Sequence, residues 1–226
     1  MKKSLFLAVV LLLSSFVGIS AKDWAFFSRY ADENAVVEKL PESQRRVVMM
    51  GNSITKMWAE TDTAFFVDNG FISRGISGQV TAQMLLRFRA DVIDLHPKVV
   101  VILGGTNDIA GNDGPYDEDT TFGNIVSMVE LAEANGIVPV LSSVLPVVEY
   151  PWNKTVTDVP EKVRGLNRRI REYAGKKNIL YVDYYRLMQR DGALIPEYTF
   201  DGVHPTAAGY EVMESLLIPA LQELLR

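Results

Sequence analysis

The chain has 226 residues, of which 48% are apolar and 23% are charged, a composition typical of a globular protein and not of a disordered, collagen-like or coiled-coil chain. Its 23 Lys and Arg residues against 28 Asp and Glu give a net charge of −5, which argues against a nucleic-acid partner. There is no cysteine, so disulfides, thiolate catalysis and a Cys-based zinc site are excluded.

The first 21 residues have the pattern of a secretory signal peptide. Lys2 and Lys3 form a positive start, residues 5–13 form an apolar centre, and Ala21 is a small residue of the kind favoured near cleavage. The apolar centre is much shorter than the roughly 20 residues that a membrane-spanning helix needs. We therefore expect cleavage and export without stable membrane insertion. The product is a secreted or periplasmic protein of bacterial type, and loss of the two lysines changes its net charge to −7.

Residues 22–226 contain no repeat, low-complexity tract or linker, which predicts a single domain. Short apolar runs rich in β-branched residues recur along it, and each predicts a buried strand. Helical spacing of apolar residues lies between them, for example over 82–92 and 125–131. This alternation predicts a three-layer α/β/α sandwich with a five-stranded parallel sheet. The predicted strands are residues 47–50, 71–73, 99–103, 138–144 and 179–182.

Polar clusters directly follow the first three predicted strands. In a parallel α/β sheet, functional groups gather beyond the carboxyl ends of the strands, so we expect these clusters to meet at one edge. A fourth cluster precedes the last helical stretch and can reach the same edge. The four clusters are Gly51 to Thr55, Gly75 to Gln79, Gly104 to Asp108 and Asp201 to Pro205.

These clusters contain the parts that acyl transfer requires. A serine hydroxyl needs an imidazole to take its proton, and the chain has only two histidines, His96 and His204. His96 precedes the third strand, at the opposite end of the sheet, and is interpreted as a solvated or capping residue. His204 follows Asp201 by three residues, a spacing that lets the carboxylate orient the imidazole. The candidate nucleophile is Ser53.

Each motif also has a purely structural interpretation. A serine after a strand is most often a helix N-cap, and the glycines of these clusters are equally expected where a turn needs positive φ. Asn107 and Asp108 fit an Asx turn, and Asp201 to Pro205 fits a polar turn before a helix. The occurrence of all the required parts at strand ends favours the catalytic interpretation.

The four polar clusters resemble the sequence motifs of a known family. Gly51-Asn52-Ser53, Gly75-x-x-Gly78, Gly105-Thr106-Asn107-Asp108 and Asp201-x-x-His204-Pro205 are similar to the four sequence blocks of the SGNH hydrolases, also called GDSL-type lipases and esterases. The branch it resembles most is that of the platelet-activating-factor acetylhydrolase subunits. The resemblance implies a flavodoxin-like sheet and Ser53, His204 and Asp201 as nucleophile, base and orienting carboxylate. It also implies an oxyanion hole formed by the Ser53 and Gly78 N–H groups and the Asn107 side chain.

Two positions depart from the family pattern. Asn52 stands where the first block usually has Asp, and Ser73 lies near a position where the second block usually has Asn. Neither is a triad or oxyanion position, but both adjoin the expected site. No metal or other cofactor is expected.

The segment after the fourth strand, residues 145–152, is expected to reach the same edge. Its Tyr150 and Trp152 either contact substrate, by stacking on a sugar or lining an acyl groove, or pin the loop to the domain. Trp58 is interpreted as a core residue. The favoured function is hydrolysis of short acyl esters, above all acetyl esters of carbohydrates. The alternatives are a lysophospholipase or thioesterase acting on longer chains, and a non-catalytic module that binds a carbohydrate or anion.

Overall fold

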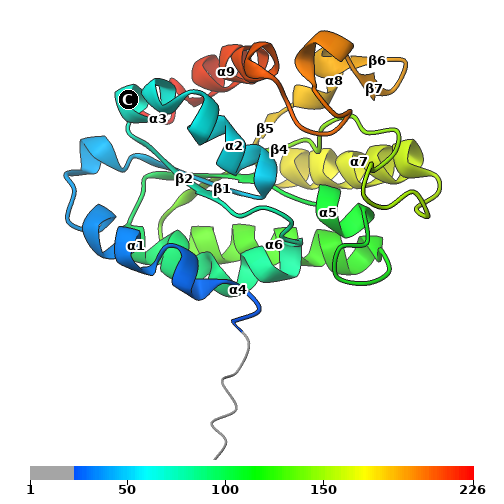
Figure 1. The fold of residues 1–226 in the computed structure, drawn as a ribbon. Helices are drawn as coiled ribbons and strands as arrows, with labels where there is room; N and C mark the ends of the chain where they lie inside the picture. The colour runs from blue at the N-terminus through cyan, green and yellow to red at the C-terminus, as the bar shows by residue number, and fades with distance from the viewer. Residues whose placement is uncertain (1–22) are drawn as a thin grey trace, which may run out of the picture.

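The computed structural model describes residues 23–226, so the predicted signal peptide lies outside the described residues. Its centre is a five-stranded sheet with the order β2-β1-β3-β4-β5, in which every neighbouring pair is parallel (Figure 1). This is the flavodoxin-like order, and it confirms the predicted fold class. The strands are β1 (Val47–Gly51), β2 (Phe71–Gly75), β3 (Val99–Leu103), β4 (Val138–Ser142) and β5 (Leu180–Val182).

Helices cover both faces of the sheet, with α1, α4, α6 and α7 on one face and α2, α3, α8 and α9 on the other (Figure 1). Within residues 23–226, no helix combines the length and the apolar character needed to cross a membrane. The α-helices are α1 (Ala31–Val37), α2 (Ser53–Thr61), α3 (Thr63–Asn69), α4 (Thr81–Asp91), α5 (Thr106–Ile109), α6 (Glu118–Ala134), α7 (Val159–Lys177), α8 (Tyr184–Met188) and α9 (Ala207–Leu221). Short 3₁₀ turns are η1 (Phe27–Arg29), η2 (Glu42–Gln44), η3 (Ile93–Leu95) and η4 (Pro196–Tyr198).

Strands β1 and β3 carry no polar side chain because both faces of the sheet are covered. Successive side chains of β1 point to opposite faces, so Val48 packs with α4, α6 and α7, whereas Val47 packs with α2, α3 and α9. Trp58 on α2 is fully buried in the second of these clusters, as predicted. The two apolar layers fix the sheet between the helices and hold its carboxyl edge in place.

A small hairpin was not among the predicted elements. Strands β6 (Gln189–Arg190) and β7 (Ala193–Leu194) pair antiparallel after α8. The turn between them has positive φ at Asp191 and Gly192, the conformation that an Asp-Gly pair favours in a two-residue hairpin. The predicted strand over 138–144 also ends earlier, at Ser142.

Candidate active site

The end of β1 positions Ser53 at the first residue of α2. The side-chain oxygen of Asn52 accepts the N–H of Ile54 at 3.0 Å and caps the helix, so this departure from the family pattern keeps a capping function. Gly75, at the end of β2, lies so close to α2 that a Cβ there would be 2.2 Å from the Lys56 nitrogen. The first turn of α2 is therefore packed directly against the sheet edge, which holds Ser53 in a defined position.

Three side chains from distant parts of the chain form a hydrogen-bonded series. The Oγ of Ser53 lies 2.9 Å from Nε2 of His204, and Nδ1 of His204 lies 2.7 Å from Oδ2 of Asp201. With Nδ1 donating to the carboxylate, Nε2 of the neutral ring is free to accept the serine proton. The structure thus brings together the three residues that the sequence nominates as a triad.

Hydrogen bonds hold Asp201 in its ionised form. Its burial acts to raise the pKa, but the backbone N–H and ring of His204 and the N–H of Val203 donate to the carboxylate and together bring the pKa below the usual value of 3.8. The carboxylate therefore stays charged at neutral pH and can stabilise a protonated imidazole.

The loop that carries Asp201 and His204 is folded around one hydroxyl. Oγ1 of Thr199 donates to the carbonyl of His204 at 2.8 Å and accepts the N–H of Gly202 at 2.9 Å. Thr199 also forms an isolated antiparallel bridge with Pro205. These local bonds close the loop on itself and aim the imidazole at Ser53.

Two of the expected oxyanion donors, Gly78 and Asn107, lie after the ends of β2 and β3. Gly78 has φ +78°, a left-handed conformation that favours glycine. Asn107, at the start of α5, is buried and uses one N–H of its amide to donate to the carbonyl of Gln79 at 2.9 Å. The second N–H of that amide remains for another acceptor. Among the described residues, no acceptor pairs with the backbone N–H of Ser53 or of Gly78.

Asp108 links this loop to the neighbouring helix. Its carboxylate accepts the backbone N–H and the hydroxyl of Thr81 at the start of α4. Burial raises the pKa of Asp108 above its usual value, although the bonds from Thr81 act in the opposite direction. The residue is therefore more than part of an Asx turn, because it joins the end of β3 to α4.

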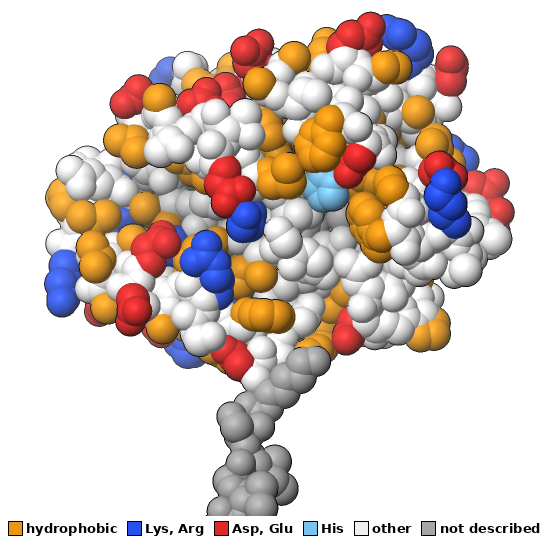
Figure 2. All heavy atoms as spheres, in the orientation of Figure 1, with side chains coloured by type: hydrophobic (Ala, Val, Ile, Leu, Met, Phe, Trp, Pro, Cys, Tyr) orange, Lys and Arg blue, Asp and Glu red, His pale blue; other side chains and the backbone are white. Residues whose placement is uncertain are grey.

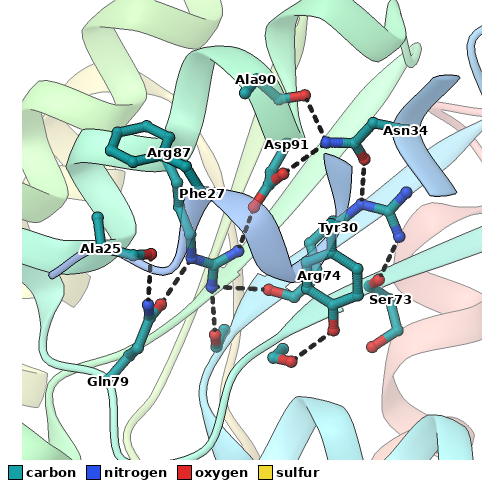
Figure 3. Close-up of polar contacts among 12 residues, drawn as sticks. Ala25, Phe27, Tyr30, Asn34, Ser73, Arg74, Gln79, Arg87, Ala90 and Asp91 are labelled. Atoms are coloured by element: carbon teal, nitrogen blue, oxygen red, sulfur yellow. Dashed lines mark hydrogen bonds and ion pairs between the residues drawn. The ribbon is translucent and has the colours of Figure 1, made fainter. Parts of the chain in front are cut away.

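A buried arginine that was not among the predicted site residues, Arg87, bonds to Gln79 and to the ends of two strands (Figure 3). Nη2 of Arg87 donates to the carbonyls of Gly51 and Arg74, both at 2.9 Å, and Nε donates to Oε1 of Gln79 at 2.6 Å. Nη1 pairs with Asp91 at 2.8 Å, and both side chains are almost fully buried. The sequence signal was an Arg and an Asp four residues apart on the buried face of α4.

This arginine joins the segments that carry the candidate groups. Gly51 lies two residues before Ser53, and Gln79 follows Gly78 and accepts from Asn107. Burial lowers the pKa of Arg87, but the hydrogen bond and charge of Asp91 act to raise it. A single guanidinium thus fixes the spacing between the serine and the loop beside it.

Tyr150 and Trp152 were both candidates for contact with the substrate, but only Trp152 is at the surface. Tyr150 is fully buried, and its hydroxyl lies 3.1 Å from Oγ1 of Thr106, so the expectation that it stacks on a sugar is corrected. Its ring packs 5.3 Å from that of Trp152 and supports it. Burial correspondingly raises the pKa of Tyr150.

Aromatic rings flank the candidate base. The ring of Trp152, 46% exposed, lies 5.9 Å from the His204 ring. Phe200, 59% exposed, stacks on the imidazole at 5.8 Å and 13°. Figure 2 shows hydrophobic side chains on either side of the imidazole coloured pale blue on this face. Phe200 was not among the predicted site residues, although this residue directly precedes the Asp201 cluster.

The remaining predicted positions lie outside this arrangement. His96 is exposed just before β3, at the opposite edge of the sheet, as expected. The hydroxyl of Ser73 donates to the carbonyl of Thr55 at 3.3 Å and so contacts α2 rather than the triad. Within residues 23–226, no three His, Asp or Glu side chains are grouped so that they could hold a metal ion.

Comparisons with known proteins identify the family of the chain. The model of the GDSL-like Lipase/Acylhydrolase family matches residues 49–212, which span all four polar clusters, and the chain belongs to this family. It is accordingly an ester hydrolase of the acylhydrolase type.

Several solved structures share the fold. A GDSL-like lipase from Bacteroides thetaiotaomicron is 52% identical, with a TM-score of 0.85, over 88% of this chain and 98% of that one. A Bacteroides fragilis protein described as an acylhydrolase is also 52% identical, with a TM-score of 0.88, over 91% of this chain and 100% of that one. An acetyl xylan esterase shares the fold at 20% identity and a TM-score of 0.61, over 77% of this chain and 98% of that one.

One curated relative matches a part of the chain. The uncharacterized lipoprotein YqeF of Bacillus subtilis is 37% identical over 81 residues, which is 34% of this chain and 33% of that protein. The match thus spans about a third of the length of that relative.

Proposed function

We propose that this acylhydrolase is an exported serine esterase that cleaves short acyl esters, above all acetyl esters of carbohydrates, with Ser53, His204 and Asp201 as its triad. The observation that carries the proposal is the pair of contacts from Ser53 Oγ to His204 Nε2 at 2.9 Å and from His204 Nδ1 to Asp201 at 2.7 Å. A serine hydroxyl is a weak nucleophile unless a neighbouring base takes its proton, and this geometry supplies the base.

In the first half of the reaction, His204 accepts the proton of Ser53 as Oγ attacks the ester carbonyl carbon. The N–H groups of Ser53 and Gly78 and the free amide N–H of Asn107 donate to the developing oxyanion. When the tetrahedral intermediate collapses, the bond to the alcohol oxygen breaks and protonated His204 gives its proton to that oxygen. The products of this half are an acyl-serine and the free alcohol.

In the second half, water takes the place of the alcohol. His204 removes a proton from the water as its oxygen attacks the acyl carbon, and the same donors stabilise the second intermediate. Collapse releases the carboxylic acid and returns the proton to Ser53. Throughout, the ionised Asp201 keeps the ring oriented and stabilises its charged form.

The preference for a short acyl group rests on the resemblance to the platelet-activating-factor acetylhydrolase branch. Hydrolysis of longer chains by a lysophospholipase or thioesterase is the alternative that the decanoate comparison below tests.

Four observations support a carbohydrate substrate and export from the cytoplasm. The same fold is found in the acetyl xylan esterase, so it is compatible with an acetylated sugar. Trp152 presents an exposed ring next to His204, where the alcohol leaves, and aromatic rings are suitable platforms for sugars. The signal pattern of residues 1–21 and the match to a bacterial lipoprotein support a location outside the cytoplasm.

The test is acetate release from a panel of acetylated mono- and oligosaccharides, with p-nitrophenyl acetate and decanoate measured in parallel. We expect acetate from at least one sugar, faster cleavage of p-nitrophenyl acetate than of the decanoate, and loss of all three activities in Ser53→Ala. A preference for the decanoate would support the long-chain alternative. A folded protein without esterase activity would support the binding module.

A further inference from the structure

The segment that precedes the first sheet strand is fixed against the oxyanion side. The carbonyl of Ala25 accepts from Nε2 of Gln79 at 2.9 Å (Figure 3). The carbonyl of Trp24 accepts from Nε2 of Gln83 on α4 at 2.7 Å. The hydroxyl of Tyr30 donates to the carbonyl of Gly75 at 2.6 Å. Residues 24–30 are thus held by α4 and by the loop, 75–79, that carries Gly78.

Buried polar contacts extend this attachment into α1. The Asn34 side chain donates to Asp91 at 2.7 Å and accepts from Nε of Arg74 at 2.9 Å (Figure 3). Asp91 is also the partner of Arg87. Because these bonds satisfy the buried carboxylate of Asp91 and the buried Nε of Arg74, the position of residues 24–37 is determined by the fold.

The attachment places two aromatic side chains next to Gly78. Trp24 and Phe26 line a cavity of about 240 Å³ together with Ser77, Gly78, Asn112 and Asp113. Phe26 is 49% exposed and has φ 55°, a left-handed conformation that is unfavourable for a bulky residue. Backbone strain of this kind persists where the surrounding structure imposes it, and it is found preferentially at binding sites.

The lining has fixed amides and free hydroxyl and carboxylate groups. Both polar ends of Asn112 are used, since Nδ2 donates to the Gly78 carbonyl at 3.1 Å and Oδ1 accepts from Trp152 at 2.9 Å. Asp113 accepts from Nε1 of Trp24 at 3.4 Å through one carboxylate oxygen. The other oxygen and the Ser77 hydroxyl face solvent without a protein partner among the described residues. Aromatic faces combined with such groups suit a ligand that has apolar ring faces and hydroxyl groups at its edges.

A chain of contacts links the wall of the cavity to the ring beside the candidate base. Trp152 lies 5.9 Å from the His204 ring and donates to Asn112, which in turn donates to the carbonyl of Gly78. Asn112 and Gly78 both line the cavity.

We propose that this cavity is a second sugar subsite, which binds the ring adjacent to the esterified one in an oligosaccharide. The inference rests on the proposed carbohydrate esterase function. The aromatic faces of Trp24 and Phe26 pack on the ring, and Asp113 and Ser77 bond its hydroxyl groups. The enzyme then selects oligosaccharide esters over esters of a single sugar.

The test measures inhibition of p-nitrophenyl acetate hydrolysis by unacetylated sugars, comparing xylobiose, cellobiose and mannobiose with xylose, glucose and mannose. At least one disaccharide should inhibit the wild type at lower concentration than its monosaccharide. Phe26→Ala and Asp113→Ala should raise the inhibition constant of that disaccharide about three- to tenfold and leave that of the monosaccharide unchanged.

Phe27→Ala is the matched control, because Phe27 is 47% exposed on the same segment but does not line the cavity. Its inhibition constants should equal those of the wild type. Phe26→Gly removes the side chain and relieves the left-handed strain, so it should weaken disaccharide binding without lowering the melting temperature. This variant separates loss of a binding group from loss of structure.

The proposal is overturned if no disaccharide inhibits better than its monosaccharide, or if Phe26→Ala and Phe26→Gly bind the disaccharide as the wild type does. The measurement uses no acetylated sugar, so it is independent of the acetate-release test. A disaccharide effect without acetate release from any sugar would contradict the proposed substrate and leave the subsite standing. Acetate release without a disaccharide effect would support the proposed substrate and contradict the subsite.

Discussion

The two sides of Ser53 are built differently. On the oxyanion side, the fully buried Arg87 bonds two strand-end carbonyls and the Gln79 side chain, and no part of this network depends on an exposed group. On the base side, the His204 and Asp201 side chains are 15% and 27% exposed and are held by bonds within their own loop. One side is part of the core, and the other is a surface loop.

The difference follows from what each side has to do in the proposed mechanism. Oxyanion donors stabilise a transition state only if they are already in place, so they need a rigid support. The base exchanges protons with the hydroxyl, the alcohol and water, so it has to be accessible from the substrate side. Changes on the oxyanion side should therefore affect stability and rate together, whereas changes on the base side should affect mainly the rate.

The largest effect is expected on the base side. Asp201→Asn removes the charge that orients and stabilises the imidazole, and kcat for p-nitrophenyl acetate should fall by about 10⁴-fold. Asp94→Asn, an exposed carboxylate at the opposite edge of the sheet, should have no effect. A decrease of less than tenfold in Asp201→Asn would show that the carboxylate is not part of the catalytic unit.

On the oxyanion side, Arg87→Met should lower the free energy of unfolding by about 3–5 kcal/mol, because it leaves Asp91 charged, buried and unpaired. Arg89→Met is the matched control on the same helix, where an exposed arginine lies 3.9 Å from Asp94, and it should change stability by less than about 0.5 kcal/mol. Chemical denaturation measures the free energy of unfolding of both variants.

A double variant refines this test. Asp91→Leu in the Arg87→Met background removes the unpaired charge and should restore much of the lost stability. If Arg87→Met alone costs less than about 1 kcal/mol, the network does not support the core as described.

Asn107→Ala should reduce kcat by about 10²–10³-fold, because one oxyanion donor is lost. The protein should stay folded, with only the bond to the Gln79 carbonyl removed. Asn124→Ala is the control, since Asn124 is a partly buried asparagine that donates one bond, at 3.1 Å, to Thr81. Full activity of Asn107→Ala would exclude the amide from the oxyanion hole.

The smallest effect concerns the pH dependence of stability on the base side. The pKa of Asp201 is lowered on folding, so the carboxylate stabilises the fold above its usual value of 3.8, and this stabilisation is lost as pH falls through the lowered pKa. The stability difference between wild type and Asp201→Asn should shrink as the pH falls below about 5. A difference that keeps growing below about pH 5 would contradict the assigned direction of the shift.

Sequence reasoning succeeded where a local pattern determines the outcome. Uninterrupted runs such as Val99–Leu103 occur almost only in buried parallel strands, and polar residues directly after them fall at one sheet edge. Ser53, His204 and Asp201 could be nominated because they occupy such positions and match a family pattern. The β6–β7 hairpin was missed although Asp191-Gly192 is a hairpin signal, because two-residue strands have no periodicity to detect.

Other features depend on tertiary contacts. The exposure of Tyr150 is decided by how its loop folds back onto Thr106, and nothing within the loop sequence distinguishes it from the exposed Trp152. The pair formed by Arg87 and Asp91 was visible as a helical spacing, but the carbonyls of Gly51 and Arg74 that it binds belong to strands far away in the sequence. The attachment of residues 24–30 to the Gly78 loop is of the same kind.

Labelling with an active-serine fluorophosphonate tests the central claim most directly, with the modified residue identified by peptide mass spectrometry. The account predicts a single label on Ser53, no label in Ser53→Ala, and labelling slowed by orders of magnitude in a folded His204→Ala protein. A label on another residue, or an undiminished rate in His204→Ala, would contradict it.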